Sequence, residues 1–177
     1  MITNKPSTCD GCVLRDKGKG FVPDLLAKNK PEYVCVGEAP GKTEVETSKP
    51  FEGKAGFVLK NWLIRAVPTI QLAAEKGRIS YCNILHCLPP EVQGRPYPKG
   101  EERVLAEQHC KQHQQLASDA HTYILFGEVP QRYFFGPELE AEDAVSRQLK
   151  RDLKGVMGRI GRVYERDGKR YVFAPHP

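Results

Sequence analysis

Short apolar runs alternate along this chain with longer segments of helical periodicity, and this alternation limits the possible folds most strongly. Residues 32–37 (EYVCVG), 78–87 (RISYCNILHC) and 122–127 (TYILFG) are rich in β-branched and aromatic side chains, as strands are. Residues 53–67 carry apolar side chains at helical spacing, and residues 100–117 begin with acidic residues, as the helix dipole favours. The sequence therefore predicts an α/β fold in which helices cover both faces of a mostly parallel sheet.

The C-terminal part of the chain predicts two more helices and a hairpin. Residues 128–136 (EVPQRYFFG) and 141–153 (AEDAVSRQLKRDL) have a helical pattern. In residues 161–175 (GRVYERDGKRYVFAP), the pair Asp167-Gly168 stands between two strand-like runs. An Asp-Gly pair in this position favours the tight turn of a β-hairpin.

Length and composition describe an ordinary globular protein. The 177 residues, 40% hydrophobic and 28% charged, are enough for one domain with a substantial core. The first residues lack the apolar run of a signal peptide, and no apolar stretch is long enough to cross a membrane. We therefore expect a single cytoplasmic domain over residues 1–177, with no membrane partner.

The positive charge is concentrated near the C-terminal end. Residues 147–170 contain nine Lys or Arg and three acidic residues, in a chain whose net charge is +5. A basic stretch of this kind suits a phosphate backbone, but it is equally typical of a solvated surface.

Polar segments follow three of the predicted strands. GEAPG follows the first strand, NILHC ends the second, and PHP follows the last. In parallel sheets, ligands bind outside the carboxyl ends of the strands. We therefore expect these three segments to contribute to one site.

The six cysteines fall into two groups. Cys35 and Cys82 lie in strand-like runs, where a free cysteine acts as a small hydrophobic side chain. Disulfides are rare in cytoplasmic proteins, so the other four thiols favour a metal centre, either tetrahedral zinc or a cubane iron–sulfur cluster. The 22 residues between the last two of them favour the cluster over zinc. These predicted ligands are Cys9, Cys12, Cys87 and Cys110.

Taken together and in this order, the motifs resemble those of the family 4 uracil-DNA glycosylases. They are the CxxC near the N-terminus, GEAPG, KPFEGKAG, YCNILHCLPP, the distant Cys110 and the terminal APHP. The resemblance spans residues 9–177. It implies a three-layer αβα fold, a [4Fe–4S] cluster on the four cysteines, and hydrolytic removal of uracil from DNA in base-excision repair, without lyase activity.

The resemblance also assigns roles to single residues. Phe51 matches the ring on which a flipped-out base stacks. Asn83 matches the amide that donates to uracil O4 and accepts from N3–H, a pattern that cytosine reverses. His176 matches the histidine that donates to uracil O2 as negative charge develops on the leaving base.

The glycine turn is expected to face the sugar. Family 1 enzymes have a water-positioning aspartate where this chain has Ala39, and family 4 enzymes lack it, so the water-handling group is left open between Glu38 and Glu44. The remaining residues of the turn are Gly37, Pro40 and Gly41. They form the tight turn that would bring backbone N–H groups and a water to the sugar; Pro40 shapes this turn and has no N–H to donate.

Three features depart from the family pattern. The loop between Cys87 and Cys110 is longer, and Glu52 replaces an apolar residue, so it either faces solvent or alters the pocket rim. The sequence also ends at Pro177, before the closing helix and the loop that presses into the DNA minor groove in the family, so it is expected to be either a fragment of a longer chain or a protein without this loop. On this basis we expect a preference for single-stranded substrate.

Two alternative functions stay open on the sequence alone. One is a glycosylase for another modified pyrimidine, which competition by free uracil would distinguish. The other is a catalytically weak iron–sulfur DNA-binding module linked to replication proteins, which would bind uracil-containing DNA without releasing the base.

Overall fold

A five-stranded sheet forms the centre of the molecule. The computed structural model describes residues 5–92, 95–96, 98–114, 120–148 and 159–176. The strand order is β2-β1-β5-β7-β6; the first four strands run parallel, and β6 is antiparallel to β7. The strands are β1 (Tyr33–Gly37), β2 (Ile79–Asn83), β5 (Thr122–Phe126), β6 (Val163–Arg166) and β7 (Lys169–Ala174).

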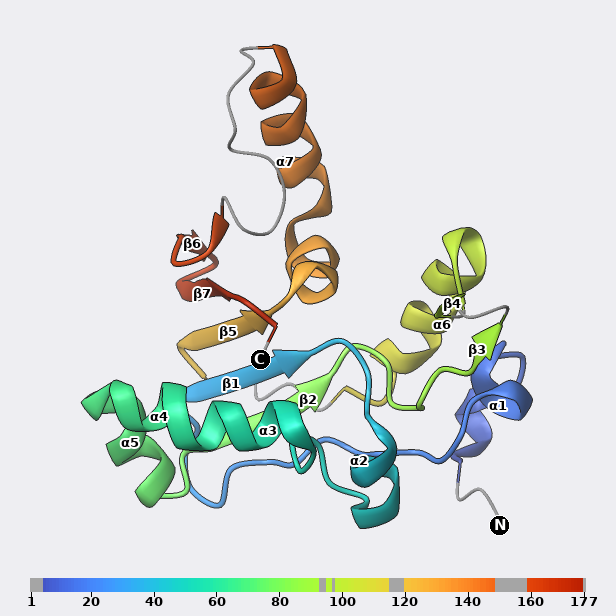
Figure 1. Cartoon of the computed structure of the whole chain (residues 1–177), viewed down its shortest axis with the longest axis horizontal. Helices are drawn as coiled ribbons and strands as arrows, with labels where there is room; N and C mark the ends of the chain where they lie inside the picture. Colours follow the sequence, from blue (N-terminus) through green and yellow to red (C-terminus); the bar gives the residue numbers. More distant parts are fainter. Residues whose placement is uncertain (1–4, 93–94, 97, 115–119, 149–158, 177) are drawn as a thin grey trace.

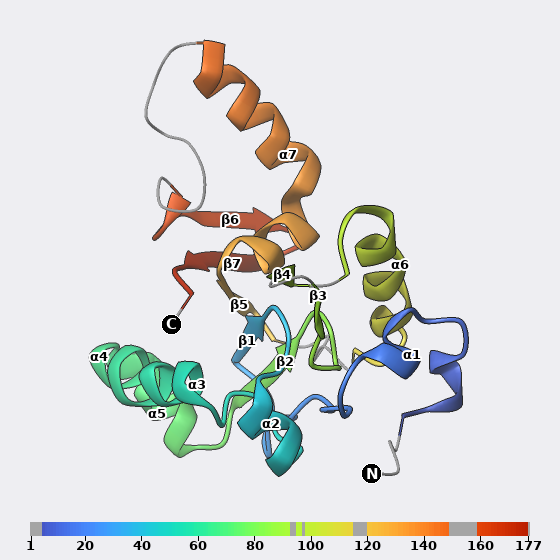
Figure 2. The same cartoon turned by 45° about the vertical axis from the view of Figure 1, so that its right-hand side comes forward.

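Helices cover both faces of this sheet, which confirms the predicted three-layer αβα arrangement (Figures 1 and 2). Val34 and Val36 of β1 pack in a core cluster with Phe135 and Leu139 of helix α7, whereas Cys35 points to the other face. Alternation along each strand thus supplies two cores from one sheet. The helices on the Cys35 side are α3 (Lys54–Val58), the π-helical turn η2 (Leu59–Leu63), α4 (Ile64–Ala66) and α5 (Pro68–Glu75).

Several element boundaries differ from the sequence prediction. The strand expected over residues 78–87 ends at Asn83, and the helix expected over residues 100–117 is α6 (Gly100–Lys111). The two helices expected after β5 meet at a kink at Phe135, whose dihedral angles are non-helical, and together they make up α7 (Glu128–Gln148). Hydrophobic periodicity locates a helix. It does not determine the residue at which the helix ends or bends, because that depends on tertiary contacts. Residues 115–117 and 149–153 of these predictions lie outside the described residues.

The loops contain further short elements. The proline-rich loop before α6 includes a small hairpin of β3 (Glu91–Val92) and β4 (Arg95–Pro96). The predicted hairpin of β6 and β7 is confirmed, and its turn residues Asp167 and Gly168 both have positive φ angles, of 52° and 72°. The remaining helices are η1 (Ser7–Cys9), α1 (Leu14–Lys17) and α2 (Lys42–Thr47).

The strand register brings the carboxyl ends of four strands to one edge of the sheet. Gly37 of β1 lies beside Asn83 of β2, and Phe126 of β5 lies beside Ala174 of β7. The GEAPG turn therefore begins next to Asn83, as expected from the parallel topology. No helix in the described part of the chain is both long and apolar enough to span a membrane.

Candidate active site and cysteine centre

Gly37 and Asn83 are in close contact at the edge of the sheet. A Cβ atom on Gly37 would lie 2.3 Å from Asn83 Oδ1 and 3.1 Å from Phe51 Cζ. Only glycine therefore leaves room for both side chains at this point. The turn is also tied to the neighbouring loop, since the N–H groups of Ile84 and Leu85 donate to the carbonyls of Gly37 and Glu38 at 3.0 and 2.9 Å.

Asn83 carries a buried polar group without a partner. The residue is 5% exposed, and its Nδ2 has no hydrogen-bond partner among the described residues. Leaving such a donor unpaired costs about 1–3 kcal/mol. The amide is therefore suited to donate to an acceptor on a ligand that enters beside Gly37.

Phe51 packs beside Gly37 at the same edge. Its ring packs on Tyr81 and Phe126, with centroid distances of 5.7 and 5.9 Å, and the residue is 5% exposed. Its φ angle of 58° is uncommon for a bulky residue. Gly56 permits this conformation, because a Cβ there would lie 1.8 Å from the Phe51 carbonyl oxygen. The structure thus brings Phe51, Gly37 and Asn83 together.

Glu44 closes the loop that carries Phe51. One carboxylate oxygen accepts the N–H of Gly41 and the other accepts the N–H of Phe51. The side chain of Glu44 therefore connects the glycine turn to the backbone of Phe51. Glu44 was one of two predicted water-handling residues, and these contacts support a positioning role for it.

Glu38, the other candidate, points to helix α6. Its Oε1 accepts from Arg103 Nη1 at 2.9 Å, and its side chain is 37% exposed. The two neighbours in the turn differ in burial: Ala39 packs against a buried core cluster, and Pro40 is buried. Glu38 is therefore the carboxylate of the turn that solvent can reach.

His176 lies beyond the end of β7 and over the end of β5. It is exposed, and a Cβ on Gly127 would lie 3.5 Å from its Cβ and Cδ2 atoms. Gly37, Asn83 and His176 thus lie at the carboxyl ends of strands, with Phe51 against Gly37. Glu52 lies outside this group, on the surface, where it pairs with Lys60 at 2.8 Å.

The four predicted metal ligands gather beside helix α6. Cys87 and Cys110 are 4% exposed and share a core cluster with Leu14, against which Cys12 also packs. Burial, with a smaller contribution from the nearby thiols, raises the pKa of the Cys87 thiol to about 11 and that of Cys110 to about 12. Burial and then Cys12 also raise the pKa of Cys9. At neutral pH these thiols are protonated, so binding a metal would release protons.

Histidines surround these thiols. The backbone N–H of His86 lies 3.5 Å from Cys110 Sγ, and His113 Nε2 lies 3.3 Å from Cys9 Sγ. His86 is fully buried and pairs with Asp24 at 2.9 Å. N–H groups beside sulfur stabilise thiolate ligands, so the donor set and its surroundings fit a thiolate-bound centre. No three His, Cys, Asp or Glu side chains in the described ranges form a ready-made site for one metal ion.

The basic C-terminal stretch is partly engaged in internal contacts. Arg159 is 1% exposed and donates to the carbonyl of Leu139. Arg166 lies 4.3 Å from the Phe135 ring centroid, donates to the Phe134 carbonyl and pairs with Glu138. These arginines stabilise the packing of the hairpin and α7, which the charge pattern alone did not predict. Residues 149–158 of the stretch lie outside the described residues.

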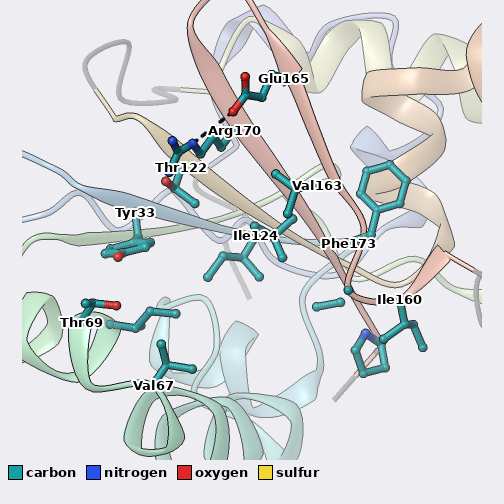
Figure 3. Close-up of a pocket in the computed structure, with 15 residues that line it drawn as sticks. Tyr33, Val67, Thr69, Thr122, Ile124, Ile160, Val163, Glu165, Arg170 and Phe173 are labelled. Carbon is teal, nitrogen blue, oxygen red and sulfur yellow. Dashed lines mark hydrogen bonds and ion pairs between the residues drawn. The ribbon is translucent and has the colours of Figure 1, made fainter.

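A cavity of about 690 Å³ lies against strands β5 and β7. Figure 3 shows it between Val67 and Thr69 of the helical layer and Ile124, Val163 and Phe173 of the sheet. Its walls are mostly apolar and include none of the predicted site residues. We therefore place the candidate chemistry at the carboxyl edge.

Sequence reasoning missed Arg103 and the pair of Asp24 and His86. Arg103 stands in an ordinary amphipathic helix pattern, and only the packing of α6 against the turn gives it a special position. His86 precedes a predicted ligand, which was a signal, but its partner is 62 positions away in the chain.

Comparison with known families defines the class of protein. The family profile described as the uracil DNA glycosylase superfamily matches residues 23–177. The chain therefore belongs to this superfamily.

Curated relatives narrow the resemblance to one branch. Type-4 uracil-DNA glycosylases are similar: that of Pyrobaculum aerophilum is 37% identical over 82 residues, and that of Archaeoglobus fulgidus is 34% identical over 102 residues. These matches cover 46% and 58% of this chain, but only 38% and 47% of the relatives. The predicted resemblance to family 4 is thereby confirmed, over less than half the length of each relative.

Proposed function

We propose that this chain hydrolyses the N-glycosidic bond of uracil in DNA, as a monofunctional glycosylase of base-excision repair. The observation that carries the proposal is the buried, unpartnered Nδ2 of Asn83 beside Gly37 and Phe51. Uracil presents an acceptor, O4, next to a donor, N3–H, and one amide can pair with both. Cytosine presents the reverse pattern and would leave polar groups unpaired.

The reaction needs few groups. A base in a duplex is inaccessible, so it enters the site after flipping out of the stack. Phe51 would then form the floor, and Gly37, Pro40 and Gly41 would line the sugar side. Water attacks C1′ while the bond to N1 of uracil breaks, and the electron pair of that bond moves onto the base.

Two side chains would assist this step. Glu38 is the solvent-reachable carboxylate of the turn, so we assign it the water. His176 would donate to O2 of the leaving uracil, where negative charge develops. The role of His176 is the one that the family resemblance implies, whereas that of Glu38 rests on its place in the turn and its access to solvent.

The test is release of uracil from a labelled oligonucleotide containing one deoxyuridine. We expect release of free uracil and an abasic site, with no strand cleavage until alkali is added. Single-stranded and duplex substrates, compared side by side, test the predicted single-strand preference. Tight binding without release would instead support the DNA-binding module.

Replacing His176 with alanine is expected to lower the single-turnover rate about 10–100-fold, the cost of one hydrogen bond to a developing charge. His121 is a matched control, because it precedes β5 at the opposite edge of the sheet. A rate unchanged in His176→Ala would remove this histidine from the mechanism.

We also propose that the four gathered cysteines hold a [4Fe–4S] cluster, with zinc as the alternative. When bound, this cluster would order the segments that carry its ligands; hydrolysis itself transfers no electron. All six cysteines of the chain are free, which supports a reducing, cytoplasmic compartment.

Metal analysis of single variants tests this assignment. Purified protein should contain about four iron atoms per chain and absorb visible light. Cys110→Ala should lose most of the iron, whereas Cys82→Ala, which changes a buried strand thiol outside the group, should retain it. One zinc atom per chain and no iron would favour the alternative.

A further inference from the structure

Arg103 is held by two carboxylates at once. Its Nη1 donates to Glu38 Oε1 at 2.9 Å, and its Nε donates to Glu107 Oε1 at 2.6 Å. Its side chain is only 17% exposed, compared with 38% for Arg132, whose Nε binds Glu128 one helical turn away in the same way. Both arginines form an ion pair with a glutamate four residues away on the same helix, but Arg103 is the more buried of the two.

Burial also restricts the position of the Arg103 guanidinium. Its Nη2 is buried and has no hydrogen-bond partner among the described residues. Enclosing a charge in this way carries a desolvation cost that a purely superficial ion pair avoids. The planar fork of the guanidinium lets Glu107 fix its orientation while a separate nitrogen meets Glu38.

The next residue of the turn packs against a buried cluster to which helix α6 contributes. Ala39 packs against this cluster, and Ala106 and Cys110 of α6 are among its members. Helix α6 therefore binds Glu38 through an ion pair and belongs to the same buried region as Ala39. The helix that supplies a predicted cluster ligand thus also fixes the predicted catalytic turn.

We propose that Arg103 is a positioning residue that fixes the carboxylate of Glu38 toward the attacking water. This inference rests on the proposed function, in which Glu38 handles the water. Arg103 engages Oε1, so Oε2 is the oxygen left to meet the water. Without Arg103 the carboxylate would sample several rotamers, and only a fraction would be productive.

A double-mutant cycle tests the inference. We expect Arg103→Met to lower kcat about 10–100-fold with KM changed less than about threefold, because a small misplacement affects the chemical step. In a Glu38→Gln background, Arg103→Met should change kcat less than about threefold, since the group it positions is already lost. Arg132→Met is the matched control and should leave kcat unchanged.

Hydrogen–deuterium exchange supplies a readout that needs no activity. Arg103→Met should accelerate uptake in a peptide spanning residues 36–44, and Arg132→Met should not. If Arg103→Met does not fold, Arg103→Lys serves instead, because one ammonium cannot bind both carboxylates through separate nitrogens in the same fixed orientation.

Each outcome decides the inference. Equal losses of kcat in both backgrounds, or unchanged uptake in residues 36–44, would overturn it. If the wild-type chain releases no uracil, the proposed function fails, and the uptake comparison alone then decides whether Arg103 fixes the turn.

Discussion

Replacing Asn83 with alanine is expected to lower kcat/KM for uracil release about 10²–10³-fold, because the site would lose the side chain assigned to O4 and N3–H of the base. The buried Nδ2 has no partner in the described structure, so removing it costs the folded protein little. We therefore expect the melting temperature to stay the same or rise. The activity would fall while the melting temperature stayed the same or rose. This result is expected for a side chain that binds the substrate and does not support the fold.

The matched control is Asn29→Ala. Asn29 donates from Nδ2 to the Lys76 carbonyl at 2.7 Å, in a surface turn away from the site. Its replacement should cost some stability and leave kcat/KM unchanged. If Asn83→Ala destabilised the fold and released uracil at the normal rate, Asn83 would be a structural residue of the strand end.

Replacing Gly56 with alanine is expected to abolish detectable uracil release and to destabilise the fold. The added Cβ would lie 1.8 Å from the carbonyl oxygen of Phe51, which is backbone and has no rotamer to adopt. The loop must therefore shift, and the ring of Phe51 with it. Overpacking of this kind costs about 1–3 kcal/mol or more, measurable by urea denaturation.

Gly136→Ala provides the comparison. Gly136 lies in α7, and a Cβ there would meet nothing within 4 Å. Because alanine favours helix, this change should be neutral or stabilise by up to about 1 kcal/mol. Normal activity in Gly56→Ala would show that the position of Phe51 does not matter to catalysis.

The sequence was sufficient to predict the sheet, the hairpin and the edge at which the site lies. Strand patterns followed by glycine or asparagine located Gly37 and Asn83, because parallel strands bring their carboxyl ends together. The gathering of Cys87 and Cys110 was also predicted, from the positions of these cysteines outside the strand cores and from the rarity of disulfides in cytoplasmic proteins. These features depend on local patterns that topology then combines.

Other features depend on contacts that no local pattern records. The bend of α7 at Phe135, the enclosure of Arg103 and the pairing of Asp24 with His86 all arise from distant segments in contact. Phe51 shows the same limit: it is buried in a core cluster, and apart from the family resemblance only its contacts with Gly37 and Asn83 relate it to the candidate site.

The two bonds of Glu44 have a consequence for how this chain can vary. Since one carboxylate joins the N–H groups of Gly41 and Phe51, it closes the intervening backbone into a ring whose ends stay fixed. Residues 46–49 on that ring are exposed. The sequence of this exposed segment can therefore vary while the two bonds of Glu44 keep Phe51 in place beside Gly37.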